Sequence, residues 1–274
     1  MSLVTTDWVL ENLNSLKIID ASWHMPAQKR NPAEEYLNAH IPNSVFFDLD
    51  KNSEKDTDLP HMLPKQEAWG KIMSSLGINN NDDILIYDNS DLKSSCRCWF
   101  SLLYFGHDEK KIHILNGGLK KWIFENKPIT KDATEIIESN YVANEKENLV
   151  VSFDQIKKNI LSKSFNVIDA RSLERFEGKV SEPRKGLRSG HIQNSFCLPF
   201  NLCINQKTGE FKNLEELREL FNQNKNIEKG LDQVFTCGSG VTAAVLAYAY
   251  KMVNNDYIPK IYDGSWSEYG KYPA

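Results

Sequence analysis

Residues 231–253 read LDQVFTCGSGVTAAVLAYAYKMV: a short apolar run, a loop of small residues and a long run of good helix formers. The first part predicts a buried strand from Leu231 to Thr236, and the last predicts a helix from Val241 to Val253. A strand, a tight loop and a helix in this order are typical of parallel α/β sheets, whose functional loops follow the carboxyl ends of the strands. The stretch therefore predicts an α/β fold with a site at residues 237–242, named here the Cys237 loop.

The Cys237 loop has the composition of a loop that activates a thiol. Gly238 and Gly240 permit backbone conformations that other residues resist, so successive N–H groups can surround the sulfur. The start of the following helix adds the positive end of its dipole. We therefore expect Cys237 to be largely thiolate near neutral pH and to act as a nucleophile. The alternative is a buried structural cysteine, which two glycines and a serine do not favour.

The two halves of the chain repeat each other in order. The matching stretches are Ile19-Asp20-Ala21 with Ile168-Asp169-Ala170, His40 to Ser44 with His191 to Ser195, Ile84 to Tyr87 with Gln233 to Thr236, and Asn116-Gly117-Gly118 before Trp122 with Asp263-Gly264-Ser265-Trp266. Their offsets lie between 147 residues (264 − 117) and 151 residues (191 − 40). Such a long, nearly constant offset predicts two copies of one domain rather than a short-period solenoid.

The expected architecture is α/β, with two tandem domains that each contain a mostly parallel sheet flanked by helices. We place the N-terminal domain at residues 1–125, a polar linker at 126–148 and the C-terminal domain at 149–274. The expected strands are Lys17 to Asp20, Val45 to Phe47, Ile84 to Tyr87 and Ile112 to Leu115, then Val167 to Asp169, Phe196 to Leu198, Val234 to Thr236 and Lys260 to Tyr262.

The repeat also indicates which domain is active. At an offset of 149 residues (237 − 88), Asp88 stands where Cys237 stands in the second copy. A carboxylate cannot perform thiolate chemistry on a soft electrophile. We therefore expect the C-terminal domain to carry the nucleophile and the N-terminal domain to shape a cleft beside it.

Composition excludes several functions. The 274 residues carry a formal charge of −4 and a pI near 5.9, which argues against a nucleic-acid partner. No apolar run is long enough to span a bilayer, and the N-terminus lacks the pattern of a secretory signal. Five cysteines leave at least one unpaired, and reduced thiols fit a cytoplasmic location best.

Several stretches together resemble the tandem-domain rhodanese superfamily, most closely its 3-mercaptopyruvate sulfurtransferases. They are Glu35 to Pro42, Leu59 to Pro64 (LPHMLP), Glu182-Pro183-Arg184, Gly190-His191-Ile192, Cys237 to Ala243 and Tyr262 to Trp266, and they cover nearly the whole chain. The resemblance implies a two-step reaction in which Cys237 takes a sulfur from a small-molecule donor as a persulfide. An acceptor thiol, cyanide or thioredoxin then removes that sulfur. No metal or cofactor is expected.

The resemblance also assigns roles to residues. The family's carboxylate-binding pair falls on Arg175 and Arg184, whose alternative is a pair of solvated surface charges. Ser239 is expected to relay or orient a proton, or to cap the following helix. Four residues of the loop complete the expected substrate-binding set: Gly238, Gly240, Val241 and Thr242. The positions after the cysteine are neutral, which favours a monoanionic donor such as 3-mercaptopyruvate over the dianion thiosulfate.

The histidines leave alternatives open. The resemblance makes His40 a tentative catalytic residue in a proton relay, although Asn31 stands in the preceding stretch where an acid would be needed. His191 occupies the place of His40 in the second copy, and a histidine present in both copies indicates a structural role. His61 is expected either to line the cleft or to anchor its loop.

Three other functions compete with this hypothesis. The first is a thiosulfate:cyanide sulfurtransferase, which keeps the chemistry and changes the donor. The second is a Cdc25-type phosphatase, which needs an arginine six positions after the cysteine, where this chain has Ala243. The third is a non-enzymatic rhodanese-type interaction module, which the intact Cys237 loop disfavours for the whole chain.

Overall fold

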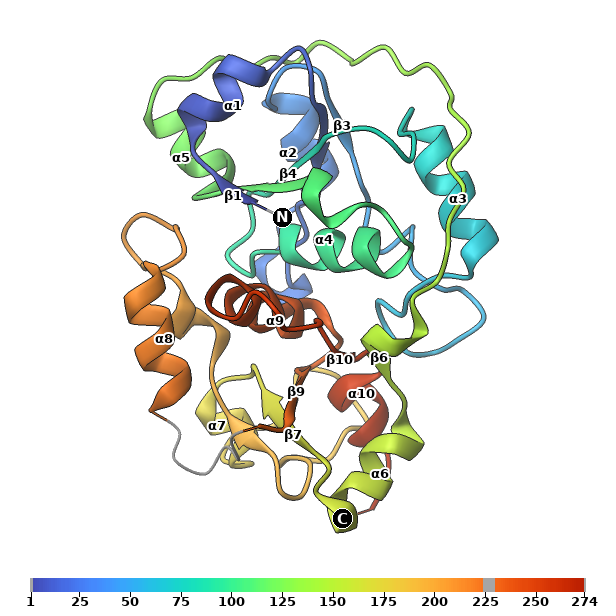
Figure 1. The fold of residues 1–274 in the computed structure, drawn as a ribbon, viewed down its shortest axis with the longest axis vertical. Coiled ribbons are helices and arrows are strands. Elements are labelled where there is room, and N and C mark those ends of the chain that lie inside the picture. Colours follow the sequence, from blue (N-terminus) through green and yellow to red (C-terminus); the bar gives the residue numbers. More distant parts are fainter. Residues whose placement is uncertain (1, 224–229, 274) are drawn as a thin grey trace. The chain divides into compact units, whose positions relative to one another are not determined.

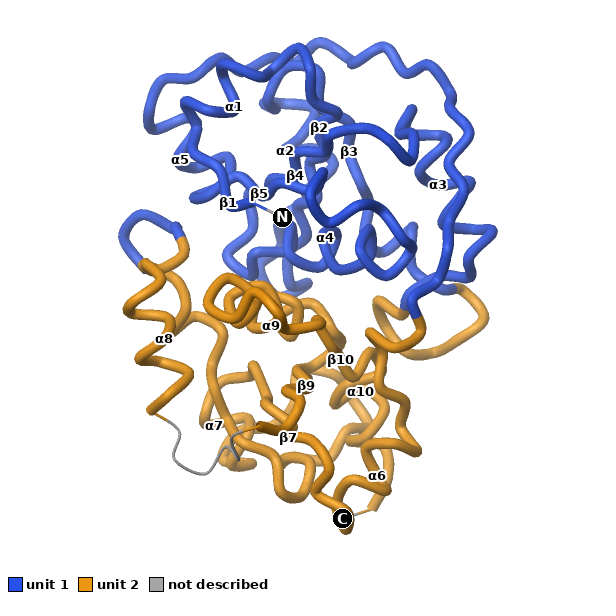
Figure 2. The backbone as a smooth tube through the Cα atoms, in the orientation of Figure 1, with its two compact units in different colours: residues 1–54, 63–146, 206–210 blue, residues 55–62, 147–205, 211–274 orange. Residues whose placement is uncertain are grey.

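A computed structural model describes residues 2–223 and 230–273 and groups the chain into two compact units (Figures 1 and 2). Unit 1 contains residues 1–54, 63–146 and 206–210, and unit 2 contains residues 55–62, 147–205 and 211–274. Two short segments, 55–62 and 206–210, are thus grouped with the other half of the sequence. The expected boundaries of domains and linker stay a prediction, because these units follow contacts rather than chain order.

Unit 1 is built on a five-stranded parallel sheet in the order β1-β5-β4-β2-β3. Its strands are β1 (Ser2–Val4), β2 (Lys17–Asp20), β3 (Ser44–Phe46), β4 (Ile84–Tyr87) and β5 (Ile112–Leu115). Its helices are α1 (Thr6–Asn12), α2 (Pro32–Asn38), α3 (Gln66–Ser75), α4 (Ser95–Tyr104) and α5 (Gly118–Phe124), with short 3-10 turns at Pro26–Gln28 and Glu109–Lys111. In the register of β2 and β4, Asp20 pairs with Tyr87, so both strands end at the same edge.

Unit 2 repeats this sheet in the order β6-β10-β9-β7-β8, again parallel. Its strands are β6 (Val150–Val151), β7 (Phe165–Asp169), β8 (Phe196–Cys197), β9 (Asp232–Thr236) and β10 (Ile261–Tyr262). Its helices are α6 (Phe153–Ser162), α7 (Leu173–Phe176), α8 (Leu214–Asn222), α9 (Val241–Val253) and α10 (Ser265–Tyr269), with 3-10 turns at Glu147–Leu149 and Phe200–Cys203. Asp169 pairs with Thr236, which brings the loop after β7 beside the Cys237 loop.

Each sheet is covered on both faces. In unit 2, Val167 and Val234 point to the face where α6 and α10 contribute Ile156 and Trp266. Helix α9 packs against β9 and β10. Unit 1 uses α1 and α5 on one face and α4 on β4 and β5 in the same way. Strands buried on both faces explain the nearly continuous apolar runs in the sequence.

The expected fold class is confirmed: two tandem domains of parallel sheet and flanking helices. The sequence predicted four strands in each copy, and each sheet has five. The missed strands, β1 and β6, have only three and two residues, too few to show a periodic pattern. Among the described residues, no helix is both long and apolar enough to cross a bilayer.

Residues 126–146, expected as part of a linker, form an extended strap bound to unit 1 (Figure 1). Thr130 exchanges two backbone hydrogen bonds with His40, and the N–H of Asn144 donates to the carbonyl of Phe105. Gly106 has a φ of +87°, and a Cβ there would lie 2.8 Å from the carbonyl oxygen of Asn144. The strap is held by backbone bonds and close approach, neither of which leaves a periodic sequence signal.

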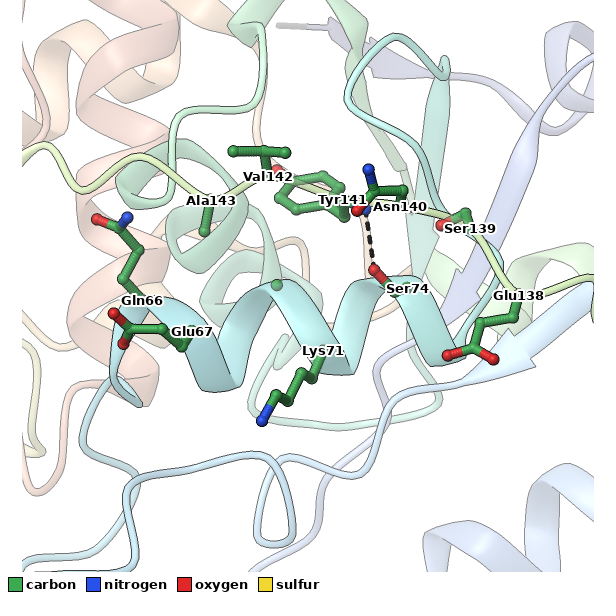
Figure 3. Close-up of a pocket in the computed structure, with 11 residues that line it drawn as sticks. Gln66, Glu67, Lys71, Ser74, Glu138, Ser139, Asn140, Tyr141, Val142 and Ala143 are labelled. Atoms are coloured by element: carbon green, nitrogen blue, oxygen red, sulfur yellow. Dashed lines mark hydrogen bonds between the residues drawn. The ribbon is translucent and has the colours of Figure 1, made fainter.

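A groove of about 420 Å³ runs between α3 and the strap (Figure 3). It is lined by Gln66, Glu67, Gly70, Lys71, Ser74 and residues 138–143. Its floor is fixed where the N–H of Tyr141 donates to the hydroxyl of Ser74 at 2.9 Å. The lining contains no cysteine and no histidine, so thiol chemistry has no place there.

Asp20 marks a chemical difference between the two sheets. Asp169, its counterpart, is bound by the guanidinium of Arg171. In unit 1 the residue in place of Arg171 is Ser22, whose N–H donates to Asp20 at 2.9 Å. Asp20 is 1% exposed. Burial raises the pKa of Asp20 from 3.8 to about 6, and the negative charge of Asp88 adds to the rise.

We predict that Asp20→Asn removes a pH-dependent loss of stability. Wild-type Asp20 releases its proton more easily in the unfolded chain, so the free energy of unfolding falls as pH rises from 3.8 to about 6. The variant lacks this loss. Its advantage over wild type should grow by ~2–3 kcal/mol between pH 4 and pH 8, measured by urea denaturation.

Asp169→Asn is the matched control, because it removes one of the two carboxylates that bind buried Arg171 and should destabilise the protein at pH 8 by ~3 kcal/mol. Equal pH slopes for wild type and Asp20→Asn would contradict the prediction.

Candidate active site

The Cys237 loop connects β9 to α9, as the sequence predicts. Helix α9 has 13 residues, and Gly240 is its N-cap, with a φ of 79°. The first N–H groups of the helix, from Val241 and Thr242, have no acceptor within it and are available to an anion. Cys237 is 2% exposed. The loop therefore combines a buried thiol with the positive end of a long helix.

Gly238 lies against two arginines and does not adopt the left-handed conformation of Gly240. Gly240 has the left-handed conformation that favours glycine, but Gly238 does not. A Cβ on Gly238 would instead lie 3.3 Å from Nη2 of Arg175 and 3.5 Å from Nη1 of Arg184. The missing side chain lets two guanidinium groups approach the residue next to Cys237. The proposed substrate-binding role of Gly238 thus has a steric basis.

Ser265 fixes the loop from behind. Its hydroxyl accepts hydrogen bonds from the N–H of Cys237 at 3.3 Å and of Gly240 at 3.1 Å, and donates to the carbonyl of Tyr262 at 2.8 Å. Ser265 has a φ of 51°, in the left-handed region that costs a serine roughly 1–3 kcal/mol. Two N–H groups expected to surround the sulfur are therefore bound by Ser265 instead. The sequence of the Tyr262 to Trp266 motif did not predict this role for Ser265.

The two residues after Ser265 hold the carbonyls of the loop. The N–H of Trp266 donates to the carbonyl of Cys237 at 2.9 Å. Ser267 donates to the carbonyl of Gly238 from both its N–H, at 3.0 Å, and its hydroxyl, at 2.6 Å. Residues 265–267 thus bind both kinds of backbone group in the loop, which leaves it little freedom to rearrange.

Ser239 contacts a histidine that sequence analysis did not assign to catalysis. The ring Nδ1 of His61 lies 2.9 Å from the hydroxyl of Ser239, and Nη2 of Arg184 donates to the same hydroxyl at 3.3 Å. His61 is 5% exposed and has a φ of 62°. It belongs to segment 55–62, which is grouped with unit 2. His61 belongs to the LPHMLP stretch, which supported the family resemblance but did not indicate that His61 contacts Ser239.

The two arginines lie beside the loop, but they are held differently. Nε and Nη2 of Arg175 donate to the carboxylate of Glu182 at 3.2 and 2.6 Å. The same carboxylate accepts from Nη1 of Arg171 at 2.9 Å. Arg175 therefore uses its two-nitrogen edge on Glu182, whereas Arg184 reaches Ser239.

Comparisons with known proteins identify the family of this chain. A family model described as a rhodanese-like domain matches residues 5–125 and again residues 152–272. The chain belongs to the rhodanese family. The protein named thiosulfate/3-mercaptopyruvate sulfurtransferase 1, mitochondrial, from Arabidopsis thaliana is 39% identical over 294 residues, which cover 99% of this chain and 76% of that protein.

Two further relatives extend the comparison to bacteria. The 3-mercaptopyruvate sulfurtransferase of Escherichia coli is 37% identical over 270 residues, which cover 97% of this chain and 94% of its own. The crystal structure of SseA from Escherichia coli, titled as a 3-mercaptopyruvate sulfotransferase, has a TM-score of 0.86 at 35% identity. That alignment covers 97% of this chain and 99% of SseA.

His40 has structural contacts in its rhodanese unit. Its Nδ1 lies 2.6 Å from the carbonyl of Tyr36 and its Nε2 lies 3.1 Å from that of Asp132, and the ring stacks on Tyr36 at 4.1 Å. His191 repeats the arrangement, with Nδ1 2.8 Å from the carbonyl of Phe176 and a stacked ring at 4.0 Å. Both nitrogens of His40 face backbone carbonyls, so these contacts favour the structural alternative over a proton relay.

The other rhodanese unit contains a carboxylate in place of the thiol. The N–H groups of Ser90 and Ser95 donate to the two carboxylate oxygens of Asp88 at 3.0 and 2.9 Å. The N–H of Leu119 donates to the carbonyl of Asp88, as that of Trp266 does to Cys237. The loop of unit 1 is thus an anion-binding loop whose anion belongs to its own side chain.

The remaining cysteines lack the environment of Cys237. Cys96, Cys98 and Cys203 are buried, and burial raises the pKa of Cys203 to about 12. Burial likewise raises the pKa of Cys98 and brings that of Cys197 to about 12. All five cysteines lie in the described ranges, and none forms a disulfide. Cys98, Cys197 and Cys203 are therefore poor nucleophiles at neutral pH.

We predict that Ser265→Ala makes the backbone of the Cys237 loop less ordered, while the loop still connects β9 to α9. The variant loses the acceptor of two loop N–H groups, so alkylation of Cys237 by iodoacetamide at pH 7 should slow on the order of tenfold. Ser265→Gly should be as slow but more stable to heat, because glycine relieves the backbone strain.

Ser267→Ala is the control, since the N–H of Ser267 still binds Gly238. Its alkylation rate should stay within about twofold of wild type, because one of two bonds to the carbonyl remains. A Ser265→Ala variant alkylated at the wild-type rate would refute the role of this hydroxyl.

Proposed function

We propose that this chain is a 3-mercaptopyruvate sulfurtransferase that carries the transferred sulfur as a persulfide on Cys237. The observation that carries the proposal is the convergence of four groups on one loop: the buried thiol, the helix start, two guanidiniums and the Ser239–His61 pair. The family membership and the names of the relatives support the same reaction class.

The first half-reaction forms one sulfur–sulfur bond and breaks one carbon–sulfur bond. The thiolate of Cys237 attacks the thiol sulfur of 3-mercaptopyruvate, and the electron pair of the C3–S bond passes to the pyruvate enolate. A proton then moves to C3, which gives pyruvate and leaves the persulfide on Cys237. The N–H groups at the start of α9 stabilise the anionic sulfur before and after transfer.

The second half-reaction regenerates the thiolate. An acceptor thiolate or cyanide attacks the outer sulfur, and the sulfur–sulfur bond electrons return to Cys237. The chemistry accepts several nucleophiles, so small thiols, cyanide and thioredoxin stay candidate acceptors. The cytoplasmic location also stays a prediction, and the Arabidopsis relative is named as mitochondrial.

Proton transfer is assigned to Ser239 and His61. The 2.9 Å contact between the hydroxyl and Nδ1 lets a proton pass between the ring and the substrate side of Ser239. Arg184, at 3.3 Å from the same hydroxyl, is positioned to bind the donor carboxylate beside it. Arg175 adds its charge to that subsite.

Thiosulfate is the second candidate donor, because the Arabidopsis relative is named for both donors. Gly238 and Ser239 add no positive charge after the cysteine, which favours the monoanion. An interaction role without chemistry remains a candidate only for unit 1, whose loop contains Asp88.

The first test of this function is sulfur loading. Wild type incubated with 3-mercaptopyruvate should release pyruvate and gain one sulfur on Cys237, detected by peptide mass spectrometry. Cys237→Ser should do neither, while Cys203→Ser should behave as wild type because that thiol is buried and keeps its proton. Pyruvate release without sulfur on Cys237 would exclude the proposed intermediate.

The second test separates the two histidines. His61→Asn should lower kcat/KM for 3-mercaptopyruvate by on the order of a hundredfold, as expected for a lost proton-transfer group. Ser239→Ala should have a similar effect, and the double variant should be little worse than either, because the two side chains act as one unit. His40→Asn should lower the thermal midpoint and leave kcat/KM within about threefold. The reverse pattern, an active His61→Asn and an inactive His40→Asn, would restore His40 as the catalytic histidine.

A further inference from the structure

Glu182 is the acidic centre of a cluster beside the Cys237 loop. Its side chain is 2% exposed and accepts hydrogen bonds from two arginines, Arg171 and Arg175. A carboxylate buried this deeply must be paired, and here both of its oxygens are bound by guanidinium groups. Glu182 therefore offsets positive charge next to the loop.

Arg171 does not depend on Glu182 for its position. Asp169 binds it through both oxygens, the carbonyl of Gly190 accepts from Nη2 at 2.8 Å, and the guanidinium lies 4.4 Å from the ring centre of Trp266. On one side, Glu182 is thus bound by an arginine whose position is fixed by other residues. On the other side it occupies the Nε–Nη2 edge of Arg175, one of the two edges through which a guanidinium can bind an anion with two hydrogen bonds.

The charges of this cluster nearly cancel. Arg171, Arg175 and Arg184 contribute three positive charges, and Asp169 and Glu182 contribute two negative ones, which leaves a single positive charge. Arg175 and Arg184 are the members that approach Gly238, next to the nucleophile. One net positive charge matches a donor with one carboxylate better than a donor with two negative charges.

We propose that Glu182 is a specificity-determining residue, which selects monoanionic sulfur donors over the dianion thiosulfate. It does so by offsetting the positive charge of Arg175 and by occupying the Nε–Nη2 edge of that guanidinium. This inference rests on the proposed function of the loop. The interaction of a fixed charge with a ligand scales with the ligand's charge. Removing the negative charge of Glu182 therefore favours a dianion about twice as strongly as a monoanion.

Unit 1 supports the idea that this pair sets the charge at the loop. Glu35, which precedes Tyr36 as Arg175 precedes Phe176, is bound by Nε and Nη2 of Arg30. The side chain of Asn89, which follows Asp88, donates to Glu35 at 2.9 Å. Unit 1 therefore has an acid, Glu35, where unit 2 has Arg175. Arg30 contacts the same loop, because its Nη2 donates to the carbonyl of Asn89 at 3.2 Å.

The experiment compares Glu182→Gln with two other variants. Glu182→Asp keeps the charge and shortens the side chain, so it reports geometric damage alone. Glu177→Gln removes one negative charge from an exposed position in the same segment, where Glu177 pairs with Lys179 at 2.6 Å. For each protein, kcat/KM is measured with 3-mercaptopyruvate and with thiosulfate, with cyanide as acceptor, and the thermal midpoint is recorded.

The ratio of the two kcat/KM values is the decisive quantity, because damage to the fold lowers both values together. Glu182→Gln should shift the ratio toward thiosulfate on the order of tenfold. Glu182→Asp and Glu177→Gln should each stay within about twofold of wild type, since the charge at the loop is unchanged. An unchanged ratio in Glu182→Gln, or a shift toward 3-mercaptopyruvate, would overturn the inference.

A binding measurement keeps this test independent of turnover. Pyruvate and sulfate are unreactive anions of one and two charges, and their dissociation constants can be taken from the protection of Cys237 against alkylation. Glu182→Gln should tighten sulfate binding several-fold more than pyruvate binding. Equal changes for both anions would overturn the inference even if the wild-type protein loads sulfur as proposed. Failure of sulfur loading alone would instead count against the proposed function.

Discussion

The structure depends on one constraint: N–H groups that follow a buried parallel strand and open a helix need a negative partner. Both units contain this strand–loop–helix arrangement, and each meets the requirement differently. In unit 1 the carboxylate of Asp88 accepts from Ser90 and Ser95, so the loop is complete without a ligand. In unit 2 the same position is Cys237, the proposed carrier of the transferred sulfur. Under this proposal, reactivity arises because unit 2 has a thiol where unit 1 has a permanent carboxylate.

A second difference follows from the first, because the surroundings of each loop match the anion it contains. Unit 2 places Arg175 against Gly238, with Glu182 behind it. In unit 1, Glu35 and Arg30 both contact Asn89, the residue after Asp88. A loop that takes anionic substrates needs a positive rim, whereas a loop closed by its own carboxylate does not. Unit 1 accordingly has one acid and one arginine at its loop, whereas two arginines approach Gly238 in unit 2.

The sequence predicts most of the fold and the centre of the site. The internal repeat and the apolar runs suffice for two parallel sheets, because such strands are buried on both faces and are flanked by helices. The residues on either side of the Cys237 loop suffice to place it between a strand and a helix, and its role as the nucleophile stays a prediction. The fifth strands and the strap at residues 126–146 are not predictable in this way, because they are short or irregular and depend on backbone bonds to distant residues.

The site residues that the sequence did not predict, His61 and Ser265, share one property: their contacts depend on tertiary structure. His61 and Ser239 are 178 positions apart in the sequence, and they meet because segment 55–62 belongs to unit 2 rather than to the unit that precedes and follows it in the chain. Ser265 acts through its backbone conformation and two N–H partners, which a side-chain motif does not reveal. The position of the Cys237 loop depends on local order in the chain, whereas the contacts of His61 and Ser265 depend on tertiary structure.

The two units also differ in backbone strain at equivalent positions. The counterpart of Ser265 in unit 1 is Gly118, which has a φ of 60° and no side chain to strain. Ser265 adopts nearly the same angle, 51°, at a cost that glycine would avoid. A serine is worth that cost only if its hydroxyl is needed, and here the hydroxyl accepts from the N–H groups of Cys237 and Gly240. Glycine at the same position of unit 1 has no hydroxyl, and its loop is bound instead through the carboxylate of Asp88, which accepts from Ser90 and Ser95. The two units therefore fix their loops through different N–H groups, and only unit 2 does so with a strained residue.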